Sequence, residues 1–190
     1  MRIAERSKLS AVEYLAWERE QPTKHEYFHG DVFAMAGGSP RHNLLCAEML
    51  ARLRETLRDA CRVFTSDQRI GVETTRYVYP DVSAVCGSFV MQPGTSDVIT
   101  NPSIIVEVLS ASTEQYDRGL KWEGYQHLAS LTDYVLVSQV APRIELYQRD
   151  RSGGWTYRAF GPGERFVLTS GAELAVDTIY FPGVFDLPGE

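Results

Sequence analysis

The sequence has few lysines, few cysteines, no long apolar run and no excess of positive charge. Its 25 acidic residues outnumber 19 basic ones, which gives a formal net charge of -6. This balance argues against a protein that coats nucleic acid through its overall charge. The apolar runs, such as Ile104 to Leu109, are much shorter than the roughly 20 residues of a membrane-spanning helix, and Glu107 interrupts this one. We therefore expect no membrane anchor.

Cysteine usage and chain length set further limits. Cys46, Cys61 and Cys86 form an odd, widely spaced set without a CxxC pair, which favours buried free thiols over a disulfide framework. Residues 1 to 9 carry charge but no apolar signal-peptide core, so we expect a cytoplasmic protein. The chain has 190 residues, 44% of them hydrophobic, which predicts a single domain over residues 1–190.

Two strong amphipathic helices are predicted. Apolar residues recur at helical spacing from Arg41 to about Ala60, with Arg and Glu between them. A second helix fits Gln115 to Ala129, with Ser112 as its N-cap. A shorter helix over residues 11 to 20 begins at a capping box formed by Ser10 and Glu13.

Strands account for most of the remainder. Residues 26 to 36 are typical of a hairpin that turns at His29-Gly30-Asp31, and further strands are predicted over residues 62–72, 81–86, 103–109, 134–138 and 144–148. The continuous apolar run at 103–109 indicates a central strand covered on both faces. The sequence therefore predicts an α/β fold. It consists of a mixed β-sheet flanked by two principal helices on opposite faces, with an extra N-terminal helix and hairpin and C-terminal short strands.

Two carboxylates interrupt these predicted strands. Glu107 sits among apolar residues, and Asp81 follows Pro80 at the start of its strand. An isolated buried carboxylate is costly, so each needs a partner. Acids at adjacent strand ends can share a divalent cation, with the Val108 carbonyl as a further ligand. Alternatively, Glu107 pairs with an arginine across the sheet and Asp81 caps a turn.

Lys121 is one of three lysines among the 19 basic residues. It lies beside apolar positions of the second helix, so its stem can run inward and place the ammonium group at the sheet edge. An exposed i, i+4 pair with Asp117 explains the residue equally well.

Histidines and a cysteine also suggest a zinc site. His25 and His29, and likewise His42 and Cys46, are four residues apart. The proposed turn begins at His29, however, and the close spacing typical of zinc motifs is absent, so we do not expect zinc.

Several of these residues fall into a known pattern. Pro80-Asp81, Glu107-Val108-Leu109 and Lys121 resemble the active-site signature of the PD-(D/E)XK nucleases, the restriction-endonuclease-like superfamily. Within it, the chain closely resembles the Uma-two family of endonucleases. The matching blocks lie between about residues 10 and 185, at positions 24–31, 39–42, 79–83, 101–110, 112–119 and 130–137. The resemblance implies a restriction-endonuclease-like fold.

The resemblance also implies roles for individual residues. Asp81 and Glu107 match the metal-holding acids, and Glu26 matches a further acidic member of the metal site. The superfamily lysine usually stands two residues after the second acid, where this chain has Leu109, so its role passes to Lys121 on the following helix. His42 matches a recurrent histidine without an assigned role.

The function implied is a Mg²⁺-dependent endonuclease that hydrolyses phosphodiester bonds, in DNA, with Mn²⁺ as an expected substitute. Arginines of the helix that begins near Arg41 would steer the nucleic acid backbone, and analogy with restriction enzymes implies a homodimer. Two alternatives stay open. One is a restriction-like module that binds nucleic acid or protein without cutting it. The other is a metal-dependent hydrolase of smaller phosphoesters.

Overall fold

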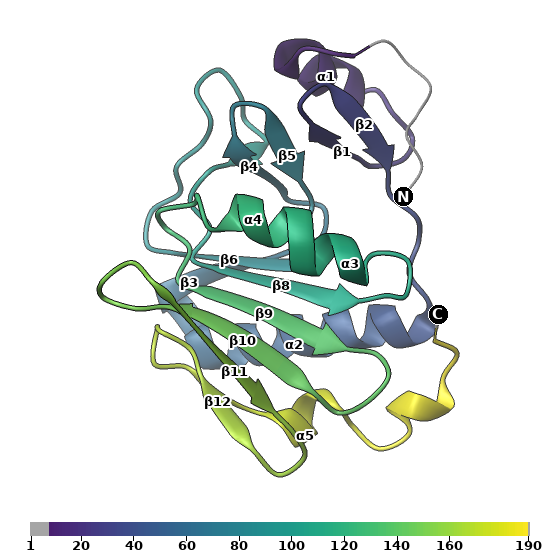
Figure 1. The fold of residues 1–190 in the computed structure, drawn as a ribbon, viewed down its shortest axis with the longest axis vertical. Helices are drawn as coiled ribbons and strands as arrows, with labels where there is room; N and C mark the ends of the chain where they lie inside the picture. Colours follow the sequence, from purple (N-terminus) through teal and green to yellow (C-terminus); the bar gives the residue numbers. More distant parts are fainter. Residues whose placement is uncertain (1–7, 190) are drawn as a thin grey trace.

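The computed structural model describes residues 8–189. The expectation that residues 1 to 9 contain no secretion signal therefore falls largely outside the described part. The main element is a six-stranded mixed sheet in the order β11-β10-β9-β8-β6-β3 (Figure 1). Its strands are β3 (Cys61–Thr65), β6 (Val82–Cys86), β8 (Ile104–Leu109), β9 (Asp133–Ser138), β10 (Ile144–Arg149) and β11 (Trp155–Phe160). Every residue of β8 is buried, as its apolar run predicts.

The two faces of this sheet are covered by helices from different parts of the chain. α2 (Pro40–Leu57) packs on one face through Leu45, Met49 and Leu53, which recur at helical spacing. The opposite face is covered by α3 (Glu114–Tyr116), a π-helical turn (Asp117–Lys121) and α4 (Trp122–Tyr125), which lie in front of the sheet in Figure 1. This second helical segment connects β8 to β9, the one parallel pair of the six-stranded sheet.

A second sheet stands beside the first, in the order β2-β1-β5-β4-β7. Its strands are β1 (His25–Phe28), β2 (Asp31–Ala34), β4 (Arg69–Glu73), β5 (Arg76–Val78) and β7 (Val98–Ile99), and α1 (Ala11–Glu18) packs against it. The hairpin β1–β2 turns at His29 and Gly30, whose φ angles are 48° and 99°. Two consecutive positive φ angles are typical of tight hairpin turns.

Arg76 joins the second sheet to α4. Its guanidinium donates a hydrogen bond of 2.8 Å to the carbonyl of Leu120 and lies 4.1 Å from the centre of the Phe28 ring. A Cβ atom at Gly124 would lie 1.8 Å from Nη1 of Arg76, so only glycine leaves room for this contact. The helical segment is thereby fixed between the two sheets.

The C-terminal part adds short elements beneath the six-stranded sheet (Figure 1). They are β12 (Arg165–Val167), β13 (Glu173–Ala175) and α5 (Val176–Ile179), with 3-10 turns at Arg58–Ala60 and Val184–Asp186. The predicted fold class is confirmed, and the structure adds the separate five-stranded sheet.

Several predicted boundaries are wrong. The strand expected over 62–72 is two strands, β3 and β4, which a turn at residues 66–68 sends into different sheets. The second helix is broken by the π-helical turn and ends at Tyr125, and its N-cap is Thr113 in place of Ser112.

The prediction of three free thiols is also wrong. Cys61 and Cys86 face each other across β3 and β6 and form a disulfide, and Cys46 alone is free. The sequence does not reveal this pair, because the two cysteines are far apart along the chain and only the pairing of β3 with β6 brings them together.

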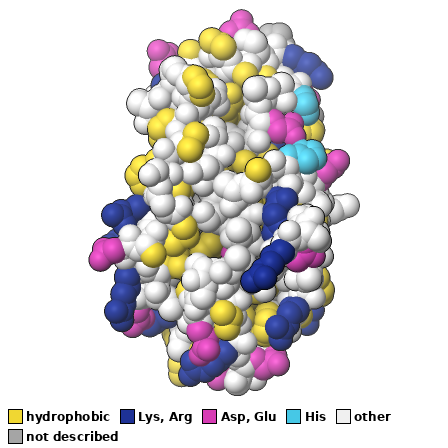
Figure 2. Space-filling model, turned by 90° about the vertical axis from the view of Figure 1, so that its left-hand side faces the viewer, with side chains coloured by type: hydrophobic (Ala, Val, Ile, Leu, Met, Phe, Trp, Pro, Cys, Tyr) yellow, Lys and Arg dark blue, Asp and Glu magenta, His cyan; other side chains and the backbone are white. Residues whose placement is uncertain are grey.

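No helix in the described range 8–189 is both long and apolar enough to cross a membrane. On the face drawn in Figure 2, Lys and Arg side chains occur mainly in the lower half, and Asp and Glu lie among them. Positive charge on this face is therefore interspersed with negative charge.

Candidate active site

Asp81 and Glu107 lie side by side where strand β6 begins. Val82 pairs with Val106 in the antiparallel register, which places the residues just outside that pair next to each other. The Val108 backbone N–H donates a 2.8 Å hydrogen bond to Oδ2 of Asp81, and the Asp81 N–H lies 3.4 Å from Oε2 of Glu107. The sheet itself therefore fixes the distance between the two carboxyl groups.

Lys121 reaches the same place from the π-helical turn. Its ammonium group lies 3.0 Å from Oε1 of Glu107 and 3.3 Å from Oδ1 of Asp117. Lys121 and Asp117 are both buried, so the i, i+4 pair exists but is not the exposed surface pair considered above. The wider π-helical turn that carries them is a feature often found at functional sites.

Glu26 contributes from the second sheet. It is buried in β1, lies 3.3 Å from the Lys121 ammonium group, and accepts a 3.2 Å hydrogen bond from the Tyr79 N–H. The predicted hairpin acid is therefore part of the cluster, although it is 55 or more residues away from the other predicted acids in sequence.

This cluster holds more carboxyl groups than cations. Glu26, Glu107 and Asp117 contact one cation, Lys121, and Asp81 lies beside Glu107. Burial raises the pKa of Glu107 well above its ordinary value, and the nearby acids Asp117, Asp81 and Glu26 raise it further against the opposing effect of Lys121. For Lys121, burial favours the neutral amine, but Glu107, Glu26 and Asp117 outweigh it and raise its pKa well above the ordinary value.

Two tyrosines complete the buried side of the cluster. The Tyr125 hydroxyl donates a 2.8 Å hydrogen bond to Oε1 of Glu107, and Tyr116 is hydrogen-bonded to Glu26. Burial and the adjacent carboxylates raise the pKa of both phenols, so both remain protonated donors. They hold Glu107 and Glu26 in fixed orientations.

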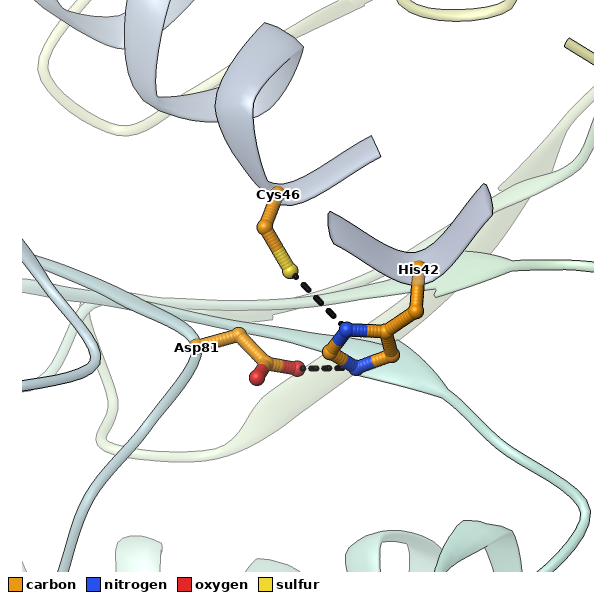
Figure 3. Close-up of side chains that lie close together, drawn as sticks. All are labelled: His42, Cys46 and Asp81. Atoms are coloured by element: carbon orange, nitrogen blue, oxygen red, sulfur yellow. Dashed lines mark hydrogen bonds and ion pairs between the residues drawn. The ribbon is translucent and has the colours of Figure 1, made fainter. Parts of the chain in front are cut away.

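His42 and Cys46 approach Asp81 from the first turns of α2 (Figure 3). The backbone N–H of His42 donates to the N-cap side chain of Ser39, which fixes the start of the helix. The ring nitrogens of His42 lie between the other two side chains, with Nε2 3.3 Å from Oδ2 of Asp81 and Nδ1 3.5 Å from Sγ of Cys46. Burial, with smaller effects of Asp81 and Glu107, raises the pKa of the Cys46 thiol.

The cluster opens into a cavity of about 410 Å³ lined by Glu26, Asp81, Glu107, Asp117 and Lys121. A second cavity of about 710 Å³ extends along α2 to the turn after β3. The two cavities adjoin at residues 35–38, His42 and Asp81, which line both of them, and we refer to the two together as the groove.

The donor set fits a hard divalent cation. Such ions take carboxylate, carbonyl and water oxygens, and Mg²⁺ uses one or two protein carboxylates. Val108 directs its N–H toward Asp81, and an extended residue directs its N–H and C=O to the same side of the strand, so its carbonyl also faces this end of β6. Asp81, Glu107 and the Val108 carbonyl are therefore able to hold a divalent cation whose charge offsets the excess of carboxylates.

The five residues to which the sequence analysis assigns a role at the catalytic site meet at this place in the structure: Glu26, Asp81, Glu107, Val108 and Lys121. Glu107 pairs with Lys121 and not with an arginine across the sheet. Sequence reasoning missed Asp117 and Tyr125 as members of the site. Their spacing of four residues on either side of Lys121, which puts all three on one helix face, was the available signal.

Known proteins resemble the chain in sequence and in fold. Residues 11–177 match the model of the family described as "Uma2: Putative restriction endonuclease". The uncharacterized proteins slr1290 and sll1609 of Synechocystis sp. (strain ATCC 27184 / PCC 6803 / Kazusa) are 41% and 32% identical to the chain. The first match covers 91% of this chain and 92% of slr1290, and the second covers 82% of this chain and 89% of sll1609.

A solved structure shares the fold. It is described as a putative nuclease belonging to DUF820 from Anabaena variabilis ATCC 29413 and superposes with a TM-score of 0.73 at 15% identity. The match covers 90% of this chain and 97% of that one, which establishes a restriction-endonuclease-like fold. On the match over residues 11–177, the chain belongs to the Uma2 family, whose description names a restriction endonuclease.

Proposed function

We propose that the protein is a Mg²⁺-dependent endonuclease that hydrolyses phosphodiester bonds in DNA. The observation that carries this proposal is a cluster of four carboxylates at one end of the groove: Glu26, Glu107 and Asp117 are buried around Lys121, and Asp81 lies beside Glu107. An excess of buried negative charge is costly unless a cation compensates it. Such a site suits a reaction in which a divalent ion coordinates a phosphate oxygen of the substrate.

Asp81 and Glu107 hold the ion, with the Val108 carbonyl and Glu26 as further proposed ligands. Mg²⁺, or Mn²⁺ in its place, supplies Lewis-acid stabilisation of charge on the phosphoryl oxygens and lowers the pKa of a bound water. Lys121, held by three carboxylates, orients the attacking water or neutralises the negative charge that develops at the phosphate. Tyr125 keeps Glu107 in place for this role.

The groove favours a polymeric substrate over a small phosphoester. It continues from the carboxylates along α2, well beyond the volume that one phosphate needs. The expected arginines of this helix serve different purposes: Arg41 donates to the carbonyls of Gln139, Phe185 and Leu187, and Arg52 pairs with Glu48 and Glu55. We therefore assign contacts with the nucleic acid backbone to Arg54, Arg58 and Arg62, which line a separate cavity of about 630 Å³.

A homodimer is part of the proposal, because two copies of the site would cut both strands of a duplex. The alternative is a module that binds nucleic acid or protein without cutting, and it predicts no dependence on Mg²⁺.

The test is a panel of substrates offered to the purified protein with Mg²⁺, with Mn²⁺ and with EDTA: supercoiled plasmid, single-stranded DNA, RNA and a simple aryl phosphodiester. Metal-dependent cutting of DNA supports the proposal. Turnover of the aryl phosphodiester alone supports the small-substrate hydrolase, and metal-independent binding without cutting supports the binding module.

A further inference from the structure

His42, Cys46 and Asp81 form a second group of metal-ligating side chains, beside the carboxylate cluster but of different chemistry. One ring nitrogen, the sulfur and one carboxylate oxygen lie within 4.8 Å of one another. Among residues 8–189, no other three His, Cys, Asp or Glu side chains lie as close together as these. His25 and His29, considered with His42 and Cys46 in the sequence, do not take part, and His25 instead contacts Glu18.

The backbone preorganises all three ligands. His42 and Cys46 are four residues apart on α2, so they lie on the same face of the helix, one turn from each other. Asp81 is fixed by the Val108 N–H at the start of β6. Each side chain is only partly exposed, and all three border the cavity that runs along α2. Figure 3 shows the sulfur and the carboxylate directed toward the same imidazole ring.

The three ligand atoms lie near the separations that a tetrahedral ion requires. Zinc binds sulfur at about 2.3 Å and nitrogen or oxygen at about 2.0 to 2.2 Å, so its ligand atoms lie roughly 3.3 to 3.6 Å from one another. The present separations are 3.5 Å between Sγ and Nδ1 and 3.3 Å between Nε2 and Oδ2, on opposite ring nitrogens. One ring nitrogen, the sulfur and one carboxylate oxygen lie within 4.8 Å of one another, so binding of an ion requires the side chains to turn and draw these three atoms closer together.

We propose that His42, Cys46 and Asp81 form a binding site for a thiophilic divalent cation such as Zn²⁺, with water in the fourth position. Thiolate and imidazole ligands select zinc over magnesium, which prefers oxygen ligands alone. Formation of the sulfur–metal bond displaces the thiol proton to solvent, and no oxidation or reduction is involved.

The shared ligand has a regulatory consequence, and this part rests on the proposed function. When the Asp81 carboxylate binds the thiophilic ion, it is no longer available as a full ligand of Mg²⁺ beside Glu107. Zinc bound at His42 and Cys46 therefore removes a ligand from the catalytic ion and inhibits Mg²⁺-dependent cleavage.

Titration with Co²⁺ as the probe tests the site without any nuclease assay. A Co²⁺–thiolate bond produces a charge-transfer absorption band, so the unreduced wild-type protein is expected to show this band with one equivalent of ion. Cys46→Ser is expected to abolish it, and His42→Ala to weaken binding by more than about 10-fold, as loss of a ligand does. Cys46→Ser retains Cys61 and Cys86, so a band that persists in this variant would come from other sulfur atoms and would overturn the proposal. A wild-type protein without the band would also overturn it.

A competition experiment tests the shared ligand. Zn²⁺ is expected to displace Co²⁺ from the wild-type protein and to inhibit plasmid cleavage at concentrations that leave Cys46→Ser uninhibited. Equal inhibition of both proteins would refute the role of the thiol. If the protein cuts nothing, the absorption band still decides whether the ion binds, so failure of the proposed function and failure of this inference are distinguishable.

Discussion

The Lys121 ammonium group lies 3.0 Å from Oε1 of Glu107, although the two residues come from a π-helical turn and from the central strand β8. The same ammonium group also contacts Glu26 of the second sheet and Asp117 of its own turn. One cation therefore connects both sheets and the helical segment between them. Its position makes the stability of the metal-free protein and the chemistry of the site depend on the same contacts.

Replacement Lys121→Met leaves three buried carboxylates without their cation. Breaking a buried ion pair by removing one partner costs about 3–5 kcal/mol, so the free energy of unfolding should fall by about that amount at neutral pH without metal. Added Mg²⁺ should restore part of the loss. Urea unfolding with and without Mg²⁺ measures both effects.

The control is Lys8→Met, because Lys8 is exposed and lies 3.8 Å from Asp31. This replacement should change the free energy of unfolding by less than about 0.5 kcal/mol. Equal effects of the two replacements would contradict the assigned role of Lys121.

Replacement Glu107→Gln should alter how stability depends on pH. The pKa of Glu107 is raised by burial, so the folded metal-free protein retains a proton that the unfolded chain has already released. The free energy of unfolding therefore falls as the pH rises from the ordinary value of 4.5 through the folded pKa. Glutamine cannot titrate, so the variant should show a flatter curve over this range. Urea unfolding in EDTA across the range provides the measurement, and parallel curves for the two proteins would show that Glu107 does not titrate as described.

Glu145 should contribute to the free energy of unfolding with the opposite pH dependence, which the replacement Glu145→Gln tests. Hydrogen bonds from Arg118 at 2.7 and 2.9 Å, together with Arg143 and Tyr157, lower the pKa of Glu145 to about 2. This stabilisation is present above the ordinary value of 4.5 and is lost as the pH falls toward about 2. At neutral pH the variant should be about 1–2 kcal/mol less stable, and the difference should shrink at about pH 3. Glu173→Gln, which breaks an exposed pair with Arg165, is the matched control and should show no comparable effect.

Thiol counting tests the disulfide. In denaturant without reductant, one thiol per chain should react, that of Cys46, and reduction should expose three. The bond closes a separation of 25 residues, so the double replacement of Cys61 and Cys86 by alanine should cost about 2–4 kcal/mol. Three reactive thiols before reduction would show that the pair is not joined.

Much of the fold was predictable because local patterns and tertiary structure agree. The capping box at Ser10 begins α1, the apolar stripe of α2 packs on the sheet, and the continuous apolar run of β8 lies at its centre. The π-helical turn was not predictable, because its widened geometry is stabilised by tertiary contacts such as that between Arg76 and the Leu120 carbonyl. The disulfide and the second sheet likewise depend on pairing between distant strands.

The residues of the candidate site were likewise predictable only in part. Asp81, Glu107 and Lys121 stand out in the sequence because charges in apolar surroundings need partners. The contributions of Asp117 and Tyr125 depend on the path of the broken helix, and the approach of Cys46 to Asp81 depends on how α2 packs beside β6. Periodicity places such residues on a face of a helix but does not reveal what that face meets.

The most direct test of the central claim is the cleavage of supercoiled plasmid by the wild-type protein and by Asp81→Asn, each with Mg²⁺ and with EDTA. Asparagine keeps the size of the side chain and removes the negative charge that the ion requires. We predict that the wild-type protein nicks the plasmid only with Mg²⁺. The Asp81→Asn variant should remain folded and should cleave at a rate at least about 100-fold lower than the wild-type protein. Equal cleavage by the two proteins, or cleavage in EDTA, would contradict the account.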